Sequence, residues 1–425
     1  MSGIWSSTAS GGSAANSIVA SADLYGDVYP ALHYHLHHVH HLPGAFSYSA
    51  ATDDRTVLGF DGKLKYIEAN RPRFEFDVDG ICKGLLIERQ DTNYIPHSED
   101  ATGWTISGEG AVTDVADIYG VGMIQYEITT GTPESFWRTN QTTTLTTVQD
   151  DIFYISLLLA SNTKDTTAIS IRDVTNSLIS RIKYSSSSGL VESEFASFVG
   201  LLDSSVETVG SLTRIKLKVQ QVSANAANSI TVGIGAGTDN DTSTTIVFGG
   251  VGVTKYDTSY VKTTTAAVTR LPDVVVSQDF SQFNESEGTI VCEFELKDLE
   301  PQAIYRLDDE TTSNYIILAL SFTALIATVV VGGVTQASIN LGVVEAGVKY
   351  RASIGFKQND FAASVNGGSV VTDSLGSIPS GLSRFKLGSY FGSGSIGVNM
   401  SGYIRDIIYY PRRVSNTLIQ EYSKL

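Results

Sequence analysis

Residues 70–100, NRPRFEFDVDGICKGLLIERQDTNYIPHSED, carry the clearest local pattern in the chain. Apolar and charged residues alternate over residues 73–78, which predicts a strand with one apolar and one charged face. The Asp-Gly pair at residues 79–80 favours a tight turn. The apolar run at residues 85–87 then suits a short buried strand. The stretch therefore predicts a small hairpin docked on a larger body.

The composition of the 425-residue chain favours β-structure in more than one domain. A chain of this length exceeds one ordinary core. Val, Ile, Ser and Thr are spread throughout, with 39 glycines and only 9 prolines, which favours strands over helices. The formal net charge of −16 argues against a nucleic-acid partner, because phosphate binding needs a basic surface.

The cysteines and apolar runs indicate no cross-linking, secretion signal or membrane insertion. Cys82 and Cys292 lie far apart in unlike contexts, so we expect two small buried side chains and no disulfide. The first residues lack a positive region followed by an apolar core, and no secretory signal is expected. The uncharged run at residues 315–331 is shorter than the roughly 20 residues of a membrane span. Two successive core strands explain it better.

Residues 1–45 are predicted to form an extended N-terminal arm. Trp5 precedes a Ser/Thr/Gly/Ala stretch at residues 6–17, a composition typical of a flexible or adaptable segment. Such an arm either threads onto a neighbouring subunit or forms a disordered terminus. On the first alternative, Trp5 and His41 are the candidate contacts with neighbouring subunits.

Six of the seven histidines lie in residues 33–41, HYHLHHVHH. On a strand, the first three would project to one side and the next two to the other. Imidazoles two residues apart would lie about 6–7 Å apart on one face, a spacing that a transition-metal ion bridges when three copies surround a three-fold axis. The candidate ligands are His33, His35, His37, His38 and His40. A polar-aromatic packing surface or a pH-sensitive contact is the alternative.

The remainder of the chain is predicted to form two β-sandwiches behind a small hairpin-containing connector at residues 46–97. Over residues 98–272, short alternating runs separated by turn residues indicate a first jelly-roll-like sandwich. Its clearest strand, at residues 213–222, is charged outside and apolar inside. Residues 273–425 are predicted to form a second sandwich, with strict alternation over residues 348–356. A short capped helix is expected at residues 415–422. The predicted fold class is therefore all-β.

The motifs of the opening stretch resemble those of tail-fibre, tail-spike and minor virion proteins of tailed bacteriophages. The matching residues are Asn70, Pro72-Arg73-Phe74, Gly84-Leu85-Leu86-Ile87-Glu88, Thr92-Asn93, Ser98-Glu99-Asp100 and Trp104, with Leu42-Pro43, Phe46, Asp61-Gly62 and Leu64 upstream. The chain departs from the family at residues 78–83, where the family has a proline-containing turn. The resemblance implies a carbohydrate-binding-module-like domain at residues 98–272 and a concanavalin-A-like, laminin-G-like domain at residues 273–425. It also implies trimers, in which buried His-x-His metal layers are frequent.

Binding is expected rather than catalysis. Glu293 and Glu295 share one predicted strand face, but the carboxylate pattern of glycosidases on this fold is absent, and no nucleophile elbow, Walker loop or zinc-protease motif occurs. Sugars bind to exposed aromatic faces flanked by a few polar groups. The glycan-binding candidates are Trp137, Tyr390 and Phe391, each of which could instead pack within a core or loop.

These observations predict a non-enzymatic bacteriophage virion protein, a tail-fibre or spike component. It would attach to other phage structural proteins by its N-terminus, form a homotrimer and present its sandwiches to host cell-surface polysaccharide. It would be assembled in the host cytoplasm and be extracellular in the mature virion. The alternatives are a purely structural head or tail decoration fibre and a polysaccharide depolymerase.

Overall fold

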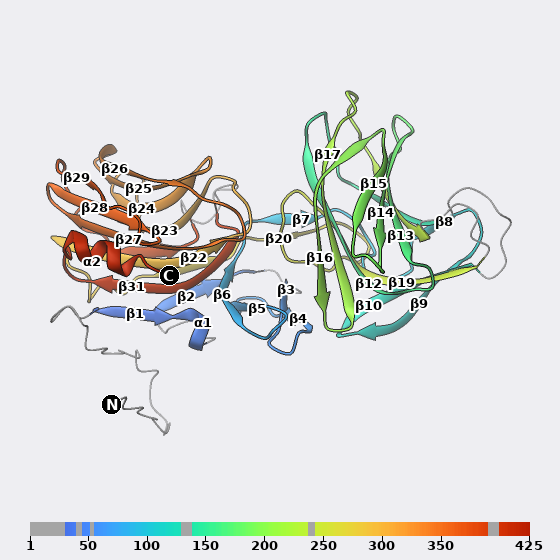
Figure 1. Cartoon of the computed structure of the whole chain (residues 1–425), viewed down its shortest axis with the longest axis horizontal. Coiled ribbons are helices and arrows are strands. Elements are labelled where there is room, and N and C mark those ends of the chain that lie inside the picture. The colour runs from blue at the N-terminus through green and yellow to red at the C-terminus, as the bar shows by residue number, and fades with distance from the viewer. Residues whose placement is uncertain (1–29, 40–44, 52–54, 129–137, 237–242, 390–398) are drawn as a thin grey trace, which may run out of the picture.

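The computed structural model describes residues 30–39, 45–51, 55–128, 138–236, 243–389 and 399–425, with His38 and Val39 described by their backbone alone. Within these ranges the chain is nearly all β (Figure 1). Four large antiparallel sheets pack in pairs as two sandwiches. The predicted all-β fold with two sandwiches is confirmed. None of the helices in these ranges is long and apolar enough to cross a membrane.

We call the first of these the inserted sandwich. Its two six-stranded sheets have the orders β16-β17-β12-β19-β10-β9 and β15-β14-β13-β18-β11-β8. The strands are β8 (Thr105–Ser107), β9 (Ala111–Ile118), β10 (Val121–Ile128), β11 (Arg138–Thr143), β12 (Ile152–Asn162), β13 (Thr166–Asp173), β14 (Leu178–Ser185), β15 (Val191–Ala196), β16 (Val199–Val209), β17 (Leu212–Gln221), β18 (Ile230–Ala236) and β19 (Thr244–Thr254). Apolar side chains from alternate positions of both sheets form its core, such as Phe153 and Phe248 of the first sheet and Ile169 and Val232 of the second, as period-two patterning predicts.

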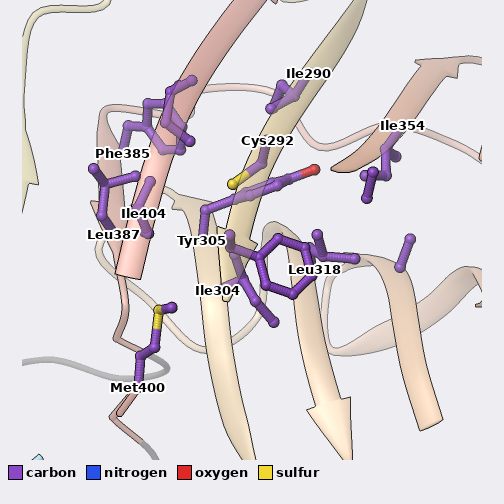
Figure 2. Packing of buried hydrophobic residues seen from close by; sticks show 14 of the residues in the cluster. Ile290, Cys292, Ile304, Tyr305, Leu318, Ile354, Phe385, Leu387, Met400 and Ile404 are labelled. Carbon is purple, nitrogen blue, oxygen red and sulfur yellow. The ribbon is translucent and has the colours of Figure 1, made fainter. Parts of the chain in front are cut away.

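The terminal sandwich combines strands from both ends of the described chain. One sheet has the order β29-β28-β27-β22-β31-β6-β5 with β1 also on β31, and the other has the order β2-β21-β30-β23-β24-β25-β26. The strands are β1 (Leu32–His35), β2 (Phe46–Ser49), β5 (Arg73–Phe76), β6 (Cys82–Ile87), β21 (Val274–Ser277), β22 (Glu287–Leu296), β23 (Gln302–Asp308), β24 (Tyr315–Ser321), β25 (Ala324–Val331), β26 (Val334–Val343), β27 (Lys349–Lys357), β28 (Asp360–Val365), β29 (Val371–Asp373), β30 (Arg384–Leu387) and β31 (Gly402–Tyr410). Figure 2 shows Cys292 and Ile404 of the first sheet packed near Tyr305 and Phe385 of the second.

The hairpin predicted in residues 73–87 is present and docks on this sandwich. Strands β5 and β6 pair with each other, and β6 pairs with β31. The turn between them is closed by a hydrogen bond from Gly80 N to Asp77 O at 3.1 Å. Gly84 has a φ of +120°, and a Cβ there would lie 2.6 Å from the carbonyl oxygen of Ile404. Glycine at this position therefore allows the hairpin to approach β31 closely.

Strand pairing distributes the predicted connector over the terminal sandwich. Strand β2 pairs with β21, and β5 and β6 extend the sheet at β31, so residues on both sides of the inserted sandwich share one core. Figure 1 shows these blue N-terminal strands against the red C-terminal ones. The short strands β3 (Arg55–Leu58) and β4 (Leu64–Ile67) form a separate hairpin. Strands β7 (Asp91–Asn93) and β20 (Val268–Arg270) pair where the chain passes between the sandwiches.

Several local predictions are confirmed. The run at residues 315–331 forms β24 and β25, and both cysteines are buried and free. Helix α2 (Asn416–Tyr422) begins where the Ser415 side chain accepts a hydrogen bond from Leu418 N. The alternation at residues 348–356 is typical of a strand with one exposed face. In the structure, however, residues 352–356 of β27 are all buried. Helix α2 and Arg413 cover its outer face, where a Cβ on Gly355 would lie 2.9 Å from Ile419.

Candidate functional site

The residues predicted as glycan or partner contacts, Trp5, His41, Trp137, Tyr390 and Phe391, lie outside the described ranges, as does the predicted metal ligand His40. The side chain of His38 is likewise not described, although its backbone lies in helix α1 (Leu36–Val39). Of the predicted site residues, His33, His35 and His37 can be placed, and they are treated below.

The two sandwiches are joined by a buried ionic network, and one of its centres is Asp273. Its carboxylate accepts hydrogen bonds from Arg73 Nη2 at 2.5 Å, from Arg55 Nη1 at 3.1 Å and from the amide of Glu88 at 2.9 Å. Tyr48 also donates to it at 2.5 Å. The Arg55, Arg73 and Asp273 side chains are fully buried. Asp273 therefore links β2, the β3–β4 hairpin, β5 and the end of β6.

Glu88 is the second centre and connects this network to both sandwiches. Its carboxylate pairs with Arg73 at 2.8 Å, with Lys297 at 2.9 Å and with Arg270, and it accepts from Ser259 Oγ at 2.6 Å. Burial alone would raise the pKa of Glu88, but Arg270, Lys297 and Arg73 hold it well below its usual value. The ionised carboxylate of Glu88 therefore connects the end of β6 to the segment that follows β19 and to the loop that follows β22.

A cleft of about 630 Å³ lies beside this network, between the two sandwiches. The inserted sandwich contributes strands β12, β16 and β17, and the terminal sandwich contributes the loop that follows β22. Its lining residues are Ile152, Tyr154, Asp203, Ser204, Ser205, Lys216, Lys218, Lys255, Tyr256, Asp257, Lys297, Asp298, Leu299, Glu300 and Ala346. A second hollow of about 350 Å³ shares Ser205, Lys216, Asp257 and Lys297 with it. The two adjoin as one elongated depression along the junction.

Two tyrosines supply the aromatic surface of this junction cleft. Tyr154 lies on β12, and Lys218 Nζ lies 5.9 Å from the centre of its ring. Tyr256 follows β19, and the Arg89 guanidinium lies 4.8 Å from its ring centre. Both tyrosines are half-buried. Because Arg89 also pairs with Asp298 at 2.8 Å, Tyr256 is held by a fixed neighbour.

The pKa values of two carboxyl groups in the junction cleft are shifted in opposite directions. Burial raises the pKa of Asp298, and Arg89 offsets this only in part. Asp298 Oδ2 is buried and has no hydrogen-bond partner among the described residues. Burial would also raise the pKa of Asp257, but Lys216, 3.0 Å away, and Lys297 lower it. The cleft therefore offers ammonium donors and carboxylate acceptors to a ligand.

The histidines that the structure describes lie against the last strand. Strand β1 pairs with β31, with His33 opposite Ile408 and His35 opposite Asp406. His33 and His35 lie on one face as predicted, but their ring centroids are 3.6 Å apart, closer than the spacing expected from the strand rise. The strand ends at His35, however, and helix α1 carries His37, whose ring lies 6.1 Å from that of His35.

Asp406 provides the acidic neighbour that the local sequence around the histidines lacks. Its Oδ1 lies 3.0 Å from His35 Nδ1 and 3.4 Å from His37 Nδ1. Burial and the neighbouring His35 lower the pKa of His33 to about 4. No local signal pointed to Asp406 or to the cleft tyrosines. The charged outer face of residues 213–222 was the one feature of the junction cleft visible in the sequence.

The carboxylates considered for catalysis are engaged in ion pairs. Glu293 binds Arg405 at 2.8 Å through one oxygen and Arg351 at 2.9 Å through the other. Glu295 lies 4.0 Å from Lys83. The predicted interpretation as a charged strand face fits this arrangement.

No protein-family model and no curated protein sequence matches the chain. Solved structures that match about a third of it include the NanB sialidase of Streptococcus pneumoniae, at 14% identity and a TM-score of 0.30, covering 34% of this chain and 25% of that one. The CBM40 of Ruminococcus gnavus IT-sialidase bound to α2,3-sialyllactose matches at 14% identity and a TM-score of 0.30, covering 33% and 84%. A SAP-like pentraxin from Limulus polyphemus matches at 12% identity and a TM-score of 0.28, covering 32% and 70%. The chain thus spans about a quarter of the length of NanB, and at these scores the likeness carries no functional argument.

Proposed function

We propose that the protein is a non-enzymatic component of a tailed-bacteriophage virion that binds host cell-surface polysaccharide in the junction cleft. The cleft itself carries this proposal. A polysaccharide needs an open, elongated depression with aromatic faces and a few polar groups, and ligand sites often form at domain interfaces. The cleft of about 630 Å³ and its adjoining hollow offer this shape. Tyr154 and Tyr256 would contact the apolar faces of sugar rings.

The charges of the junction cleft suit a ligand with many hydroxyl groups. Lys216, Lys218 and Lys255 supply donors, and Asp203 and Glu300 supply acceptors. Lys297 is oriented by its ion pair with Glu88, so its position is set before a ligand arrives. A pre-formed site loses little side-chain entropy on binding.

The virion assignment rests on the resemblance of residues 70–104 to phage fibre and spike proteins. The structure gives these motif residues a common physical role. Arg73, Glu88, Asn93, Ser98 and Glu99 are buried polar residues whose hydrogen bonds and ion pairs fix the joint between the sandwiches. The resemblance therefore lies in the part of the chain that creates the junction cleft.

The test is binding of the full-length chain to a panel of purified bacterial capsular and O-antigen polysaccharides and to whole cells. Y154A and Y256A should each weaken binding by about ten-fold, corresponding to about 1.4 kcal/mol. The matched control is L375A, because Leu375 is 73% exposed and lies beside the Asn359 turn, at the end of β27 opposite to the one near the cleft. This variant should bind as wild type does. Absence of binding to every polysaccharide and cell favours the structural decoration alternative. Release of reducing ends would identify a depolymerase.

A further inference from the structure

We infer that His33, His35 and Asp406 bind one divalent transition-metal ion within a single chain, between the first and last described strands of the terminal sandwich. One ligand atom of each residue lies within 4.8 Å of the others. Ligands on opposite sides of a zinc ion are about 4 Å apart at most, because each bond is about 2.0–2.2 Å long. Small side-chain rotations would therefore close the site around an ion.

His33 shows the gap that an ion would fill. Its Nε2 is buried and has no hydrogen-bond partner among the described residues. A buried nitrogen without a partner is costly, and a metal bond satisfies it.

The neighbouring hydrogen bonds orient the other imidazoles. His35 Nδ1 lies 3.0 Å from Asp406 Oδ1, and His37 Nδ1 lies 3.1 Å from the carbonyl oxygen of Arg405. A carbonyl oxygen only accepts, so His37 Nδ1 carries the proton and its Nε2 keeps the lone pair. Asp406 is itself a proposed ligand, so a bound ion would take the place of the hydrogen bond between His35 Nδ1 and Asp406 Oδ1.

The two oxygens of Asp406 have different neighbours, because Oδ1 faces His35 and His37 while Oδ2 pairs with Arg351. Arg351 and Arg405 both pair with Glu293, at 2.9 and 2.8 Å, and Arg351 approaches Asp406 Oδ2 at 3.3 Å. Two imidazoles and one carboxylate suit zinc, iron, cobalt or nickel rather than calcium, which prefers oxygen ligands. Bound there, the ion would fasten β1 to β31 without a second chain, unlike the three-fold site predicted from the histidine spacing.

The histidine-rich stretch at residues 33–41 can bind metal weakly by itself. The test must therefore separate binding by this stretch alone from binding that also requires Asp406. The full-length chain is stripped with EDTA, loaded with Co²⁺ or Zn²⁺ and dialysed, and retained metal is measured together with the Co²⁺ visible spectrum. The decisive pair is D406N against E293Q. Glu293 lies opposite Asp406 in the β22–β31 register and shares Arg351 with it, so E293Q makes the same charge change beside the site. A second pair is H33A/H35A against H38A/H40A/H41A.

Wild type, E293Q and H38A/H40A/H41A should retain one ion per chain. D406N and H33A/H35A should bind at least ten-fold more weakly. Circular dichroism of the metal-free variants checks folding, and if D406N does not fold, the single variant H33A on the sheet-edge strand decides. Unchanged binding by D406N, or by H33A where that variant decides, would show that the stretch acts alone and overturn the inference. One ion per three chains would overturn it in favour of the three-fold site.

Discussion

Arg73 Nη2 lies 2.5 Å from Asp273 Oδ2, and neither side chain has exposed surface. The two residues are 200 positions apart, on opposite sides of the inserted sandwich in the chain. Asp273 also bonds Arg55 and the amide of Glu88. One carboxylate thereby forms ion pairs with two buried guanidinium groups at the joint between the sandwiches.

Replacing this carboxylate should strongly destabilise the protein. In D273N, Arg55 and Arg73 keep their charges in a buried site and lose their ion pairs with Asp273, although Arg73 keeps its pair with Glu88. Removing one partner of a buried pair typically costs about 3–5 kcal/mol. Urea unfolding of the full-length chain measures the loss. The control is E68Q, because the Arg71–Glu68 pair is 3.9 Å long with side chains 72% and 84% exposed, and such pairs contribute about 0–1 kcal/mol. Equal losses in the free energy of unfolding for D273N and E68Q would contradict the central role of Asp273 in the buried ionic network.

Stability should fall as the pH drops from 6.5 towards 4. His33 has a pKa of about 4 in the folded chain, against 6.5 as its ordinary value, so the unfolded chain binds this proton more tightly. Its contribution is complete above pH 6.5 and is lost as the pH falls through this window. We expect wild type to lose on the order of 2 kcal/mol more than H33N between pH 7 and 4.5, after allowance for partial exposure. The free energy of unfolding of each variant is measured by urea titration in EDTA at several pH values. An identical pH dependence of wild type and H33N would contradict the prediction.

Removing residues 1–97 should abolish folding of the terminal sandwich. The deletion takes β1, β2, β5 and β6 with it, and Phe74, Leu85 and Ile87 leave the shared core. Each buried side chain of this kind contributes about 1.5–3 kcal/mol. We expect insoluble protein, or loss of one cooperative transition on heating. Deletion of residues 1–29 retains every described strand and serves as the control, and a folded, monodisperse product from the longer deletion would contradict the pairing.

Both thiols should react only after unfolding. Cys82 and Cys292 are buried, and burial raises the pKa of each thiol, well above its usual value for Cys292. Since the thiolate is the reactive form, labelling by a thiol-specific reagent should follow the unfolding transition in urea. Rapid labelling of either cysteine in native buffer would show that its strand opens locally.

Local patterns in the sequence predicted much of the fold. Alternation identified β12, β14 and β17, and the serine at position 415 identified the start of α2. These signals are local, because period-two burial and helix capping involve residues close in the chain. They also indicated a hairpin at residues 73–87. In the long apolar run at residues 315–331 they indicated two strands rather than a membrane span.

Long-range pairing had no such signal. Strand β6 joins β31 because both fit the same core, and nothing in residues 82–87 specifies a partner over 300 positions away. The same limit applies to the sites. Asp406 reaches His35 only through the β1–β31 register, and Tyr154 and Tyr256 meet at a cleft that exists only once both sandwiches are in place.

The discontinuity of the terminal sandwich sets an order of events during synthesis. His35 precedes its partner Asp406 by 371 positions, so at about 5–20 residues per second the ribosome needs roughly 20–70 s to deliver the second strand. The inserted sandwich is continuous in the chain and can be complete by then. During this interval the N-terminal strands β1, β2, β5 and β6 have no partner strands from the C-terminal part of the sandwich. Unpaired strand edges promote aggregation, so newly synthesised chains should be most prone to aggregate at this stage.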